Sequence, residues 1–168
     1  MARIVLASGS PRRQELLRRM GIDTFTVRVP QVEEAFPAGL TPQETVEYIS
    51  REKSQAVPSD AEEIVITADT MVFLDDKKLG KPADEAEALA MLNALQGRHH
   101  TVCTGVTVRQ GQRALTRAQS TDKAGAYGVQ GQGALLVERI DGDFFNVMGL
   151  PVVLLSEMLK EFGVTLLG

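Results

Sequence analysis

The sequence predicts an α/β fold with a mixed, partly antiparallel sheet and flanking helices. Strand-like and helix-like segments alternate over the first half of the 168 residues, strand-like segments then cluster, and a helical pattern closes the chain. The composition is 43% hydrophobic and 24% charged, which excludes an intrinsically disordered chain. The length is enough to bury a core, and the sequence contains neither a repeat nor a low-complexity linker. We therefore expect a single domain over residues 1–168.

Two helices have clear signals at their starts. An apolar run over residues 3–7 predicts a short buried strand, and Ser10 followed by Pro11 is typical of a helix start, with a side-chain oxygen at the cap and proline in the first turn. Gly21 is expected to end this helix. Residues 41–44 (TPQE) form a capping box that predicts the start of a second helix. Its buried stripe is expected to contain Val46, Ile49 and Ala56.

The rest of the chain alternates between strand and helix patterns. The sequence IVITADTMVFLDD at residues 64–76 predicts a central strand that continues into a second one, and Asp141-Gly142 is a strong hairpin signal. The remaining patterns predict an amphipathic helix over 83–97, followed by a hairpin in which a strand at 99–108 pairs with the residues after the turn at 109–112. They then predict strands at 133–140 and 144–149 and a final helix over 151–162.

The charge distribution points to a compact anionic ligand. The net charge of the chain is −4, yet the first 20 residues contain five arginines and a single glutamate. A general nucleic-acid binder carries broader basic patches interleaved with aromatic side chains, whereas this chain has only eight Phe and Tyr residues and no Trp. We therefore expect a small-molecule ligand and no binding to nucleic acid.

Cysteine content and hydropathy predict a cytoplasmic protein. Cys103 is the single cysteine, so an internal disulfide is impossible, and a small buried core residue is the expected role. No stretch approaches the ~18 uninterrupted apolar residues of a membrane span, and the first residues lack the apolar segment of a secretory signal. We expect no membrane association.

The stretch SGSPRR predicts an anion site at a helix start. The first backbone N–H groups and the positive end of the helix dipole meet there, and Arg12 and Arg13 in the first turn are disfavoured by that dipole unless an anion lies nearby. The alternative is that both arginines face solvent. The chain has neither a GxxxxGK[ST] loop nor the glycine spacing of a dinucleotide fingerprint, so these two phosphate-binding folds are excluded.

Carboxylates mark a second candidate site. Asp69 follows the apolar run 64–68, so we expect it where a buried strand ends, a position from which a carboxylate can hold a metal or take a proton from water. Glu33 and Glu34 could supply a further oxygen ligand for Mg²⁺ or Mn²⁺. The alternatives are a turn-forming aspartate and an acidic pair on a loop, both of which are common.

Three further polar residues are open to two interpretations. Lys53 and Lys81 are by composition solvated surface lysines, although Lys81 lies between Gly80 and Pro82, where the backbone is restricted. The glycine-rich segment 124–133 permits close backbone approach to a flat ligand and leaves the amide of Gln130 for hydrogen bonds. A glycine-rich approach to a hairpin explains the same segment.

Seven motifs in order give the sequence a strong resemblance to a known family. They cover nearly the whole chain and are LASGSPRRQELL, the glutamate of QVEEAF, REKSQA, ADT, LGKP, DKAGAYGVQG and VMGLP. Together they resemble the Maf family of nucleoside triphosphate pyrophosphatases. The resemblance implies a Maf/Ham1-like fold, similar to the inosine triphosphate pyrophosphatases, with two lobes around a substrate cleft, and it implies a divalent metal cofactor, Mg²⁺ or Mn²⁺, and a homodimer.

The resemblance also implies an activity, the hydrolysis of dTTP and UTP, and of modified pyrimidine nucleotides, to the monophosphate and pyrophosphate. By position, Asp69 would accept the proton of the attacking water and, with Glu33, help to bind the metal. The groups that would hold the phosphates are Ser8, Ser10, Arg13, Lys53 and Lys81. Arg12, Thr70 and Gln130 would select the base; a subgroup that is linked to 7-methyl-GTP has tryptophan, glutamine and glutamate at these places.

One departure from the family and two other functions stay open at this point. In the family a longer segment separates the hairpin near RQGQR from DKAGAYG, whereas here few residues lie between them. Either the protein lacks this segment or residues are missing between Gln119 and Asp122 of the printed sequence.

The two other functions are a nucleotide-binding regulator of cell division or septum formation and a nucleic-acid binding module. The net acidity of the chain argues against the nucleic-acid binding module.

Overall fold

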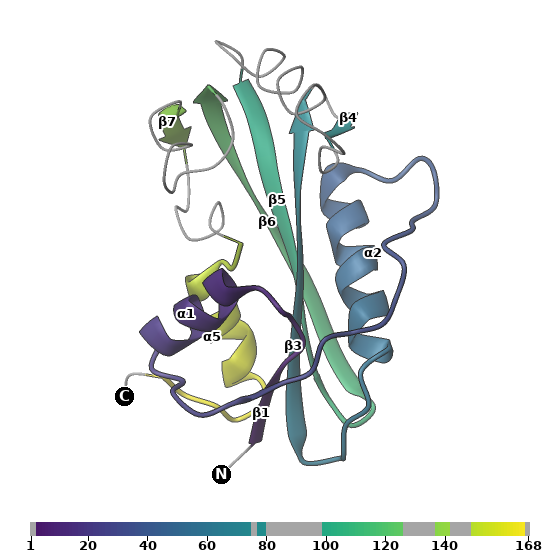
Figure 1. Ribbon diagram of the computed structural model, residues 1–168, viewed down its shortest axis with the longest axis vertical. Helices are drawn as coiled ribbons and strands as arrows, with labels where there is room; N and C mark the ends of the chain where they lie inside the picture. Colours follow the sequence, from purple (N-terminus) through teal and green to yellow (C-terminus); the bar gives the residue numbers. More distant parts are fainter. Residues whose placement is uncertain (1–2, 75–76, 80–98, 126–136, 142–148, 167–168) are drawn as a thin grey trace.

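A computed structural model describes residues 3–74, 77–79, 99–125, 137–141 and 149–166, and these form one mixed sheet with helices on both faces (Figure 1). The strand order is β2-β1-β3-β5-β6-β7, and β4 pairs with β3. The elements are, in chain order, β1 (Arg3–Leu6), α1 (Pro11–Arg19), β2 (Thr26–Val27), α2 (Pro42–Gln55), β3 (Glu63–Leu74), β4 (Lys77–Leu79), β5 (His99–Gln110), β6 (Arg113–Gly125), β7 (Val137–Asp141) and α5 (Val152–Lys160). The predicted mixed α/β fold class is confirmed.

The sheet combines parallel and antiparallel pairing around β3. Strands β2 and β3 run parallel to β1, whereas β3, β5, β6 and β7 form successive antiparallel pairs. The pairing of β1 with β3 stops where Leu6 lies opposite Ile66, but β3 continues to Leu74. Asp69 therefore lies inside a long strand, and the expectation that it lies where a strand ends is wrong. The strand that ends beside it is β1, because the chain turns there into α1.

The alternation of side chains along β3 builds a core on each face of the sheet. Helices α1 and α5 cover one face and α2 covers the other, as Figure 1 shows. Ile64 and Ile66 pack in a buried cluster with residues of α1 and α5, such as Leu17. Met71 and Phe73 pack instead in a cluster with residues of α2. The two faces of one strand therefore meet different helices.

The predicted helix starts are confirmed by their capping hydrogen bonds. The Ser10 side chain accepts from the backbone N–H of Arg13, and Pro11 is the first residue of α1. Both hydrogen bonds of the TPQE capping box are present: Thr41 Oγ1 accepts from Glu44 N and Glu44 Oε1 accepts from Thr41 N, each at 3.1 Å. Each helix therefore begins at the residue that its local sequence specifies.

The expected buried stripe of α2 is confirmed only in part. Val46 and Ile49 are buried, but Ala56 is exposed. Ala56 is the C-cap and lies at the very end of the helix, beyond the residues that the sheet covers.

Helix α2 lies very close to the sheet at Gly105 of β5. A Cβ atom added to Gly105 would lie 2.2 Å from the backbone oxygen of Val46 and 2.7 Å from the backbone nitrogen of Glu47. Only glycine permits this distance between helix and strand. The contact fixes the height of α2 above β3 and β5, and thereby the position of side chains that α2 directs toward β3.

An ion pair anchors the short edge strand β2. Just after β2, Arg28 donates hydrogen bonds from Nη1 and Nη2 to the two carboxylate oxygens of Glu63, at 2.8 and 2.7 Å. Glu63 begins β3, and its pairing with Arg28 holds its pKa at about 2. The pair therefore stays charged at neutral pH and ties the edge of the sheet to its centre.

Several sequence predictions concern segments outside the described residues. These are the helix at 83–97, Lys81, Gln130, the glycine-rich segment after Gly125, the strand at 144–149 and the cleft between two lobes to which they would contribute. The final helix is confirmed, because α5 begins after Pro151 and Gly163 follows its last turn with a φ of 82°. In the described part of the chain, no helix has the length and apolar character needed to cross a membrane.

Candidate active site

Strand β3 directs two neighbouring candidate residues to opposite faces of the sheet. Asp69 contacts Lys53 of α2, whereas Thr70 contacts Arg13 of α1. Both residues are held in the sheet by pairing with β5, where they lie opposite Gly105 and Thr104. The alternation of a β-strand therefore brings groups from both helices to one point along β3.

Asp69 is a buried carboxylate with one oxygen that has no partner. Its exposed fraction is 3%, and its Oδ1 atom accepts a hydrogen bond from Lys53 Nζ at 3.1 Å. Its Oδ2 atom is also buried and has no hydrogen-bond partner among the described residues. Burial raises the pKa of Asp69, and the positive charge of Lys53 opposes this rise. An orphaned carboxylate oxygen of raised basicity is suited to accept a proton or to contact a cation.

Lys53 joins two carboxylates and is not a solvated surface group. Only 12% of its side chain is exposed, and Nζ lies 3.1 Å from Asp69 Oδ1 and 2.9 Å from Glu34 Oε1. The composition-based interpretation of Lys53 as a surface lysine is therefore wrong, because the last turn of α2 directs it inward. Glu34 and its neighbour Glu33 are both exposed, but Glu34 forms the ion pair with Lys53, whereas Glu33 has no ion pair with a described residue.

Arg13 is held at three points from different parts of the chain. Its Nε donates to the backbone oxygen of Gly149 at 2.8 Å, its Nη2 to Thr70 Oγ1 at 3.0 Å, and its Nη1 to Ser8 Oγ at 3.4 Å. Burial lowers the pKa of Arg13, while the negative charges of Asp69 and then Glu34 oppose this shift. The guanidinium group therefore lies within the electrostatic reach of the same carboxylates that contact Lys53.

The turn from β1 to α1 places a hydroxyl acceptor, Ser8 Oγ, beside Arg13. The Ser8 side chain is buried and accepts from the backbone N–H of Ser10 at 3.1 Å, so the small residues of the turn organise one another. Arg12 is exposed, and its positive charge contributes to lowering the pKa of Arg13. The interpretation of both arginines as solvent-facing therefore fits Arg12 but not Arg13. Positive charge that repels itself in this way favours a bound anion.

The described residues can offer a metal ion only a small number of ligands. Among them no group of three or more His, Cys, Asp or Glu side chains has the geometry to hold a metal ion. The pair of Asp69 and Glu34 around Lys53 is the acidic feature of the site. Mg²⁺ commonly binds through one or two carboxylates and takes its other ligands from phosphates and water. A metal that acts together with a phosphate ligand is therefore compatible with this site.

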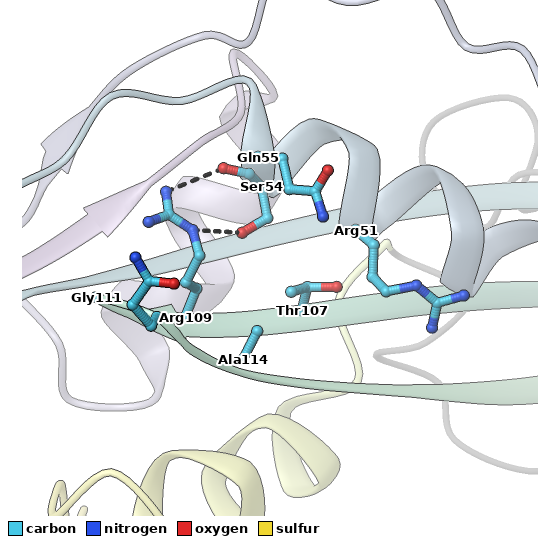
Figure 2. Close-up of a pocket in the computed structure, with 8 residues that line it drawn as sticks. Arg51, Ser54, Gln55, Thr107, Arg109, Gly111 and Ala114 are labelled. Carbon is cyan, nitrogen blue, oxygen red and sulfur yellow. Dashed lines mark hydrogen bonds between the residues drawn. The ribbon is translucent and has the colours of Figure 1, made fainter.

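A separate hollow of about 250 Å³ lies between α2 and the β5–β6 hairpin (Figure 2). Arg51 and Arg109 are among its lining residues, but Arg109 donates to four neutral oxygen atoms, including the backbone oxygens of Ser54 and Val57 at the end of α2. This arginine caps the helix, and none of the described residues that line the hollow carries a carboxylate. The hollow contains none of the candidate active-site residues.

Three residues that contact the site were not selected from the sequence. Glu34 was named with Glu33 as a possible metal ligand, but the resemblance assigned only Glu33, while Thr104 and the backbone oxygen of Gly149 were not singled out. The VMGLP motif contains Gly149, so the resemblance carried a signal for it. Thr104 has no local signal, because its contact with Thr70 depends on the pairing of β3 with β5.

Comparison with known proteins identifies the family that the sequence motifs resemble. The profile of a family described as Maf-like protein matches residues 3–121 and 112–162. A dTTP/UTP pyrophosphatase of Exiguobacterium sibiricum is 44% identical over 183 residues, which cover 96% of this chain and 93% of the relative. A dTTP/UTP pyrophosphatase of Moorella thermoacetica is 42% identical over 193 residues, with 100% and 99% covered.

Two solved structures share the fold at low sequence identity. A HAM1 protein from Coxiella burnetii has a TM-score of 0.61 and 18% identity, with 96% of this chain and 100% of that chain covered. A nucleoside-triphosphatase described as a dITP/XTP pyrophosphatase from Mycobacterium abscessus has a TM-score of 0.50 and 15% identity, with 96% and 97% covered. The Ham1-like fold expected from the sequence is therefore confirmed.

The alignments also show that this chain is shorter than its relatives. The alignment with the Moorella protein spans 193 residues, so at least 25 of its positions have no counterpart among the 168 residues of this chain. The two segments that match the family profile overlap at residues 112–121. This overlap agrees with the short connection noted between Gln119 and Asp122. In the structure, β6 passes through this point and stays paired with β5 throughout.

Proposed function

This chain belongs to the Maf family, and from that membership we propose that it hydrolyses dTTP and UTP to the nucleoside monophosphate and pyrophosphate. Relatives named dTTP/UTP pyrophosphatase are similar over nearly the full length of the chain. The observation that carries the proposal is the buried, orphaned oxygen of Asp69, one residue away from the Thr70 contact of a fixed arginine. Modified pyrimidine nucleotides are further proposed substrates.

Asp69 is the proposed proton acceptor for the water that attacks the α-phosphate. Its Oδ1 atom is already held by Lys53, which fixes the orientation of the carboxylate, and its Oδ2 atom has the free lone pairs that a proton acceptor requires. A raised pKa makes the carboxylate a stronger base than an ordinary aspartate. Lys53 therefore positions the base, and burial strengthens it.

The proposed phosphate clamp surrounds this base. Arg13, Lys53 and the positive N-terminal end of the α1 dipole supply positive charge on the two faces of β3. Transfer at phosphorus depends mainly on positioning and on stabilising negative charge, which these groups supply. Ser8 and Ser10 organise the turn beside the clamp, and Lys81 is proposed to complete it.

A divalent cation fits the acidic side of the site. The orphaned Oδ2 atom of Asp69 and the carboxylate of Glu34 are oxygen donors of the kind that Mg²⁺ and Mn²⁺ prefer, and Lys53 contacts both residues, Asp69 through its other oxygen, Oδ1. Such an ion neutralises charge on the phosphates when it is bound. Glu33 was expected to be a ligand by position in the sequence. We propose Glu34 for this role, because Glu34 reaches the site in the structure.

A pair of matched variants tests this choice of ligand. Glu34→Gln is expected to raise by about tenfold the Mn²⁺ concentration that gives half-maximal activity, since a ligand beside Lys53 is lost. Glu33→Gln, which removes the same charge from the neighbouring exposed residue, is expected to change it little. Titration of bound Mn²⁺ by electron paramagnetic resonance in the presence of dTTP gives a second measurement. The opposite ranking of the two variants would assign the ligand to Glu33.

Base selection is proposed to involve Arg12, Thr70 and Gln130. Hydrogen-bonding side chains suit the carbonyl-rich edge of a pyrimidine, and a site that offers such bonds rejects bases that leave them unpaired. In the structure the Thr70 hydroxyl already accepts from Arg13. Thr70 is therefore linked to the phosphate clamp as well as to the proposed base site.

A panel of nucleoside triphosphates tests the proposed function. The purified chain with Mg²⁺ or Mn²⁺ is expected to release pyrophosphate, and not phosphate, from dTTP and UTP faster than from purine nucleotides. Chelation of the metal by EDTA is expected to stop the reaction. Binding of dTTP without any release of pyrophosphate would reject the enzyme and favour the alternative of a nucleotide-binding regulator.

A further inference from the structure

Thr104 is a fully buried hydroxyl group next to the phosphate clamp. It lies on β5 with an exposed fraction of 0%, and its Oγ1 atom is 2.8 Å from Thr70 Oγ1. The backbone places the two residues directly opposite each other in the antiparallel pair. A hydroxyl buried without any partner would be costly, so this contact is part of what allows Thr104 to lie there.

The partner of Thr104 is the group that orients one end of Arg13. A guanidinium group can only donate, so Thr70 Oγ1 must offer a lone pair to Arg13 Nη2, which lies 3.0 Å away. The hydroxyl of Thr70 has a single hydrogen and rotates freely unless a second bond fixes it. The bond to Thr104 is such a restraint. Thr104 therefore determines which way Thr70 presents its lone pairs.

The other contacts of Arg13 do not replace this restraint. The bond to the backbone oxygen of Gly149 holds the guanidinium group at its Nε atom. The contact from Nη1 to Ser8 Oγ is long, at 3.4 Å. Nη2, the atom that meets Thr70, is thus set chiefly by the hydroxyl pair. A planar fork that is fixed at both ends is pre-organised to bind a phosphate.

We propose that Thr104 is a positioning residue, which acts through Thr70 to hold the guanidinium group of Arg13 in the orientation that binds the substrate phosphates. This proposal rests on the proposed function and adds to it a residue on β5 that does not itself touch the substrate. The chain of contacts runs from Thr104 to Thr70 to Arg13 on the face of the sheet that α1 covers.

Three variants test this role through activity. Thr104→Val keeps the shape of the side chain but removes the hydroxyl, and it is expected to lower kcat/KM for dTTP by about tenfold. Thr104→Ser keeps the hydroxyl and is expected to restore most of the activity. Thr107→Val is the matched control, because Thr107 is equally buried on the same strand but bonds to Ser50 and Thr116 on the opposite face.

A double-mutant cycle separates positioning from simple stability. In an Arg13→Lys background the guanidinium fork is absent, so adding Thr104→Val is expected to change kcat/KM by less than about twofold. Thr107→Val is expected to lower the melting temperature about as much as Thr104→Val without changing kcat/KM. An effect of Thr104→Val that is as large in the Arg13→Lys background, or one that Thr107→Val reproduces, would overturn the proposal.

A readout on Arg13 itself keeps this test independent of turnover. The ¹H–¹⁵N signal of Arg13 Nε, assigned by its loss in Arg13→Lys, is expected to shift and to exchange faster with water in Thr104→Val, but not in Thr104→Ser or Thr107→Val. An unchanged signal and unchanged kcat/KM in Thr104→Val would reject the positioning role. If the parent protein hydrolyses no nucleotide, the proposed function fails, and the Nε signal still decides whether Thr104 positions Arg13.

Discussion

Asp69→Asn is expected to reduce kcat for dTTP by about 10²- to 10⁴-fold, which is the range that general base catalysis supplies. Asparagine keeps the shape of the side chain, but its amide cannot accept a proton from water at neutral pH. The substitution leaves the proposed phosphate clamp of Arg13 and the α1 turn unchanged, so nucleotide binding is expected to stay within about threefold of the parent. Pyrophosphate release and the dissociation constant for dTTP, measured on the same preparation, check the two halves of this result.

The pH dependence of turnover gives this prediction a second measurement. Asp69 must be charged to accept a proton, and burial raises its pKa, so kcat is expected to fall on the acid side at a higher pH than an ordinary aspartate would cause. Asp69→Asn is expected to remove this acid limb. Asp23→Asn serves as the control, because Asp23 is exposed in the turn after α1. Equal rates for Asp69→Asn and the parent would refute the assignment of the base.

Gly105→Ala is expected to destabilise the fold by about 3 kcal/mol or more, the upper part of the range for overpacked sites. The new methyl group would meet the backbone of α2 at 2.2 Å, and a backbone atom cannot move away as the end of a flexible side chain can. Helix α2 must therefore shift away from β5. For a chain of this length the melting temperature is expected to fall by about 6 to 12 °C, measured by circular dichroism.

A second glycine gives a matched control for this effect. A Cβ atom added to Gly9 would meet only the Cγ2 atom of Val29 at 3.5 Å, which is an ordinary contact, so Gly9→Ala is expected to change the melting temperature by less than 2 °C, within about ±0.5 kcal/mol. In Gly105→Ala the displaced helix also carries Lys53 away from Asp69, so activity should fall together with stability. A Gly105→Ala protein as stable as the parent would show that α2 is free to move on the sheet.

Features that depend on neighbouring residues could be predicted from the sequence. The caps at Ser10 and Thr41 are specified within four residues, and the structure has both hydrogen-bonded as expected. The final helix and the hairpin between β5 and β6 follow for the same reason, since each is bounded by local turn or cap residues. The family resemblance, carried by motifs in order, is confirmed by the match to the family profile.

Features that depend on pairing between distant segments could not be predicted. Asp69 looked like a strand end because the apolar run stops before it, yet β5 continues the pairing past this point. Lys53 looked solvated because nothing in its neighbourhood along the chain shows that α2 directs it onto β3. The close approach at Gly105 and the hydroxyl pair of Thr70 and Thr104 arise only when α2, β3 and β5 are assembled.

The adjacency of Asp69 and Thr70 means that the proposed base and the clamp are joined by a single peptide unit. Successive Cα atoms across a trans peptide are 3.8 Å apart, and both residues are locked into the ladder with β5. Rocking of either helix can therefore strain the contacts to Lys53 or Arg13 but cannot change the spacing of these two residues. The Cα atoms of the proposed base and of the residue that contacts Arg13 therefore keep a spacing that the backbone of β3 sets and that motions of the loops do not change.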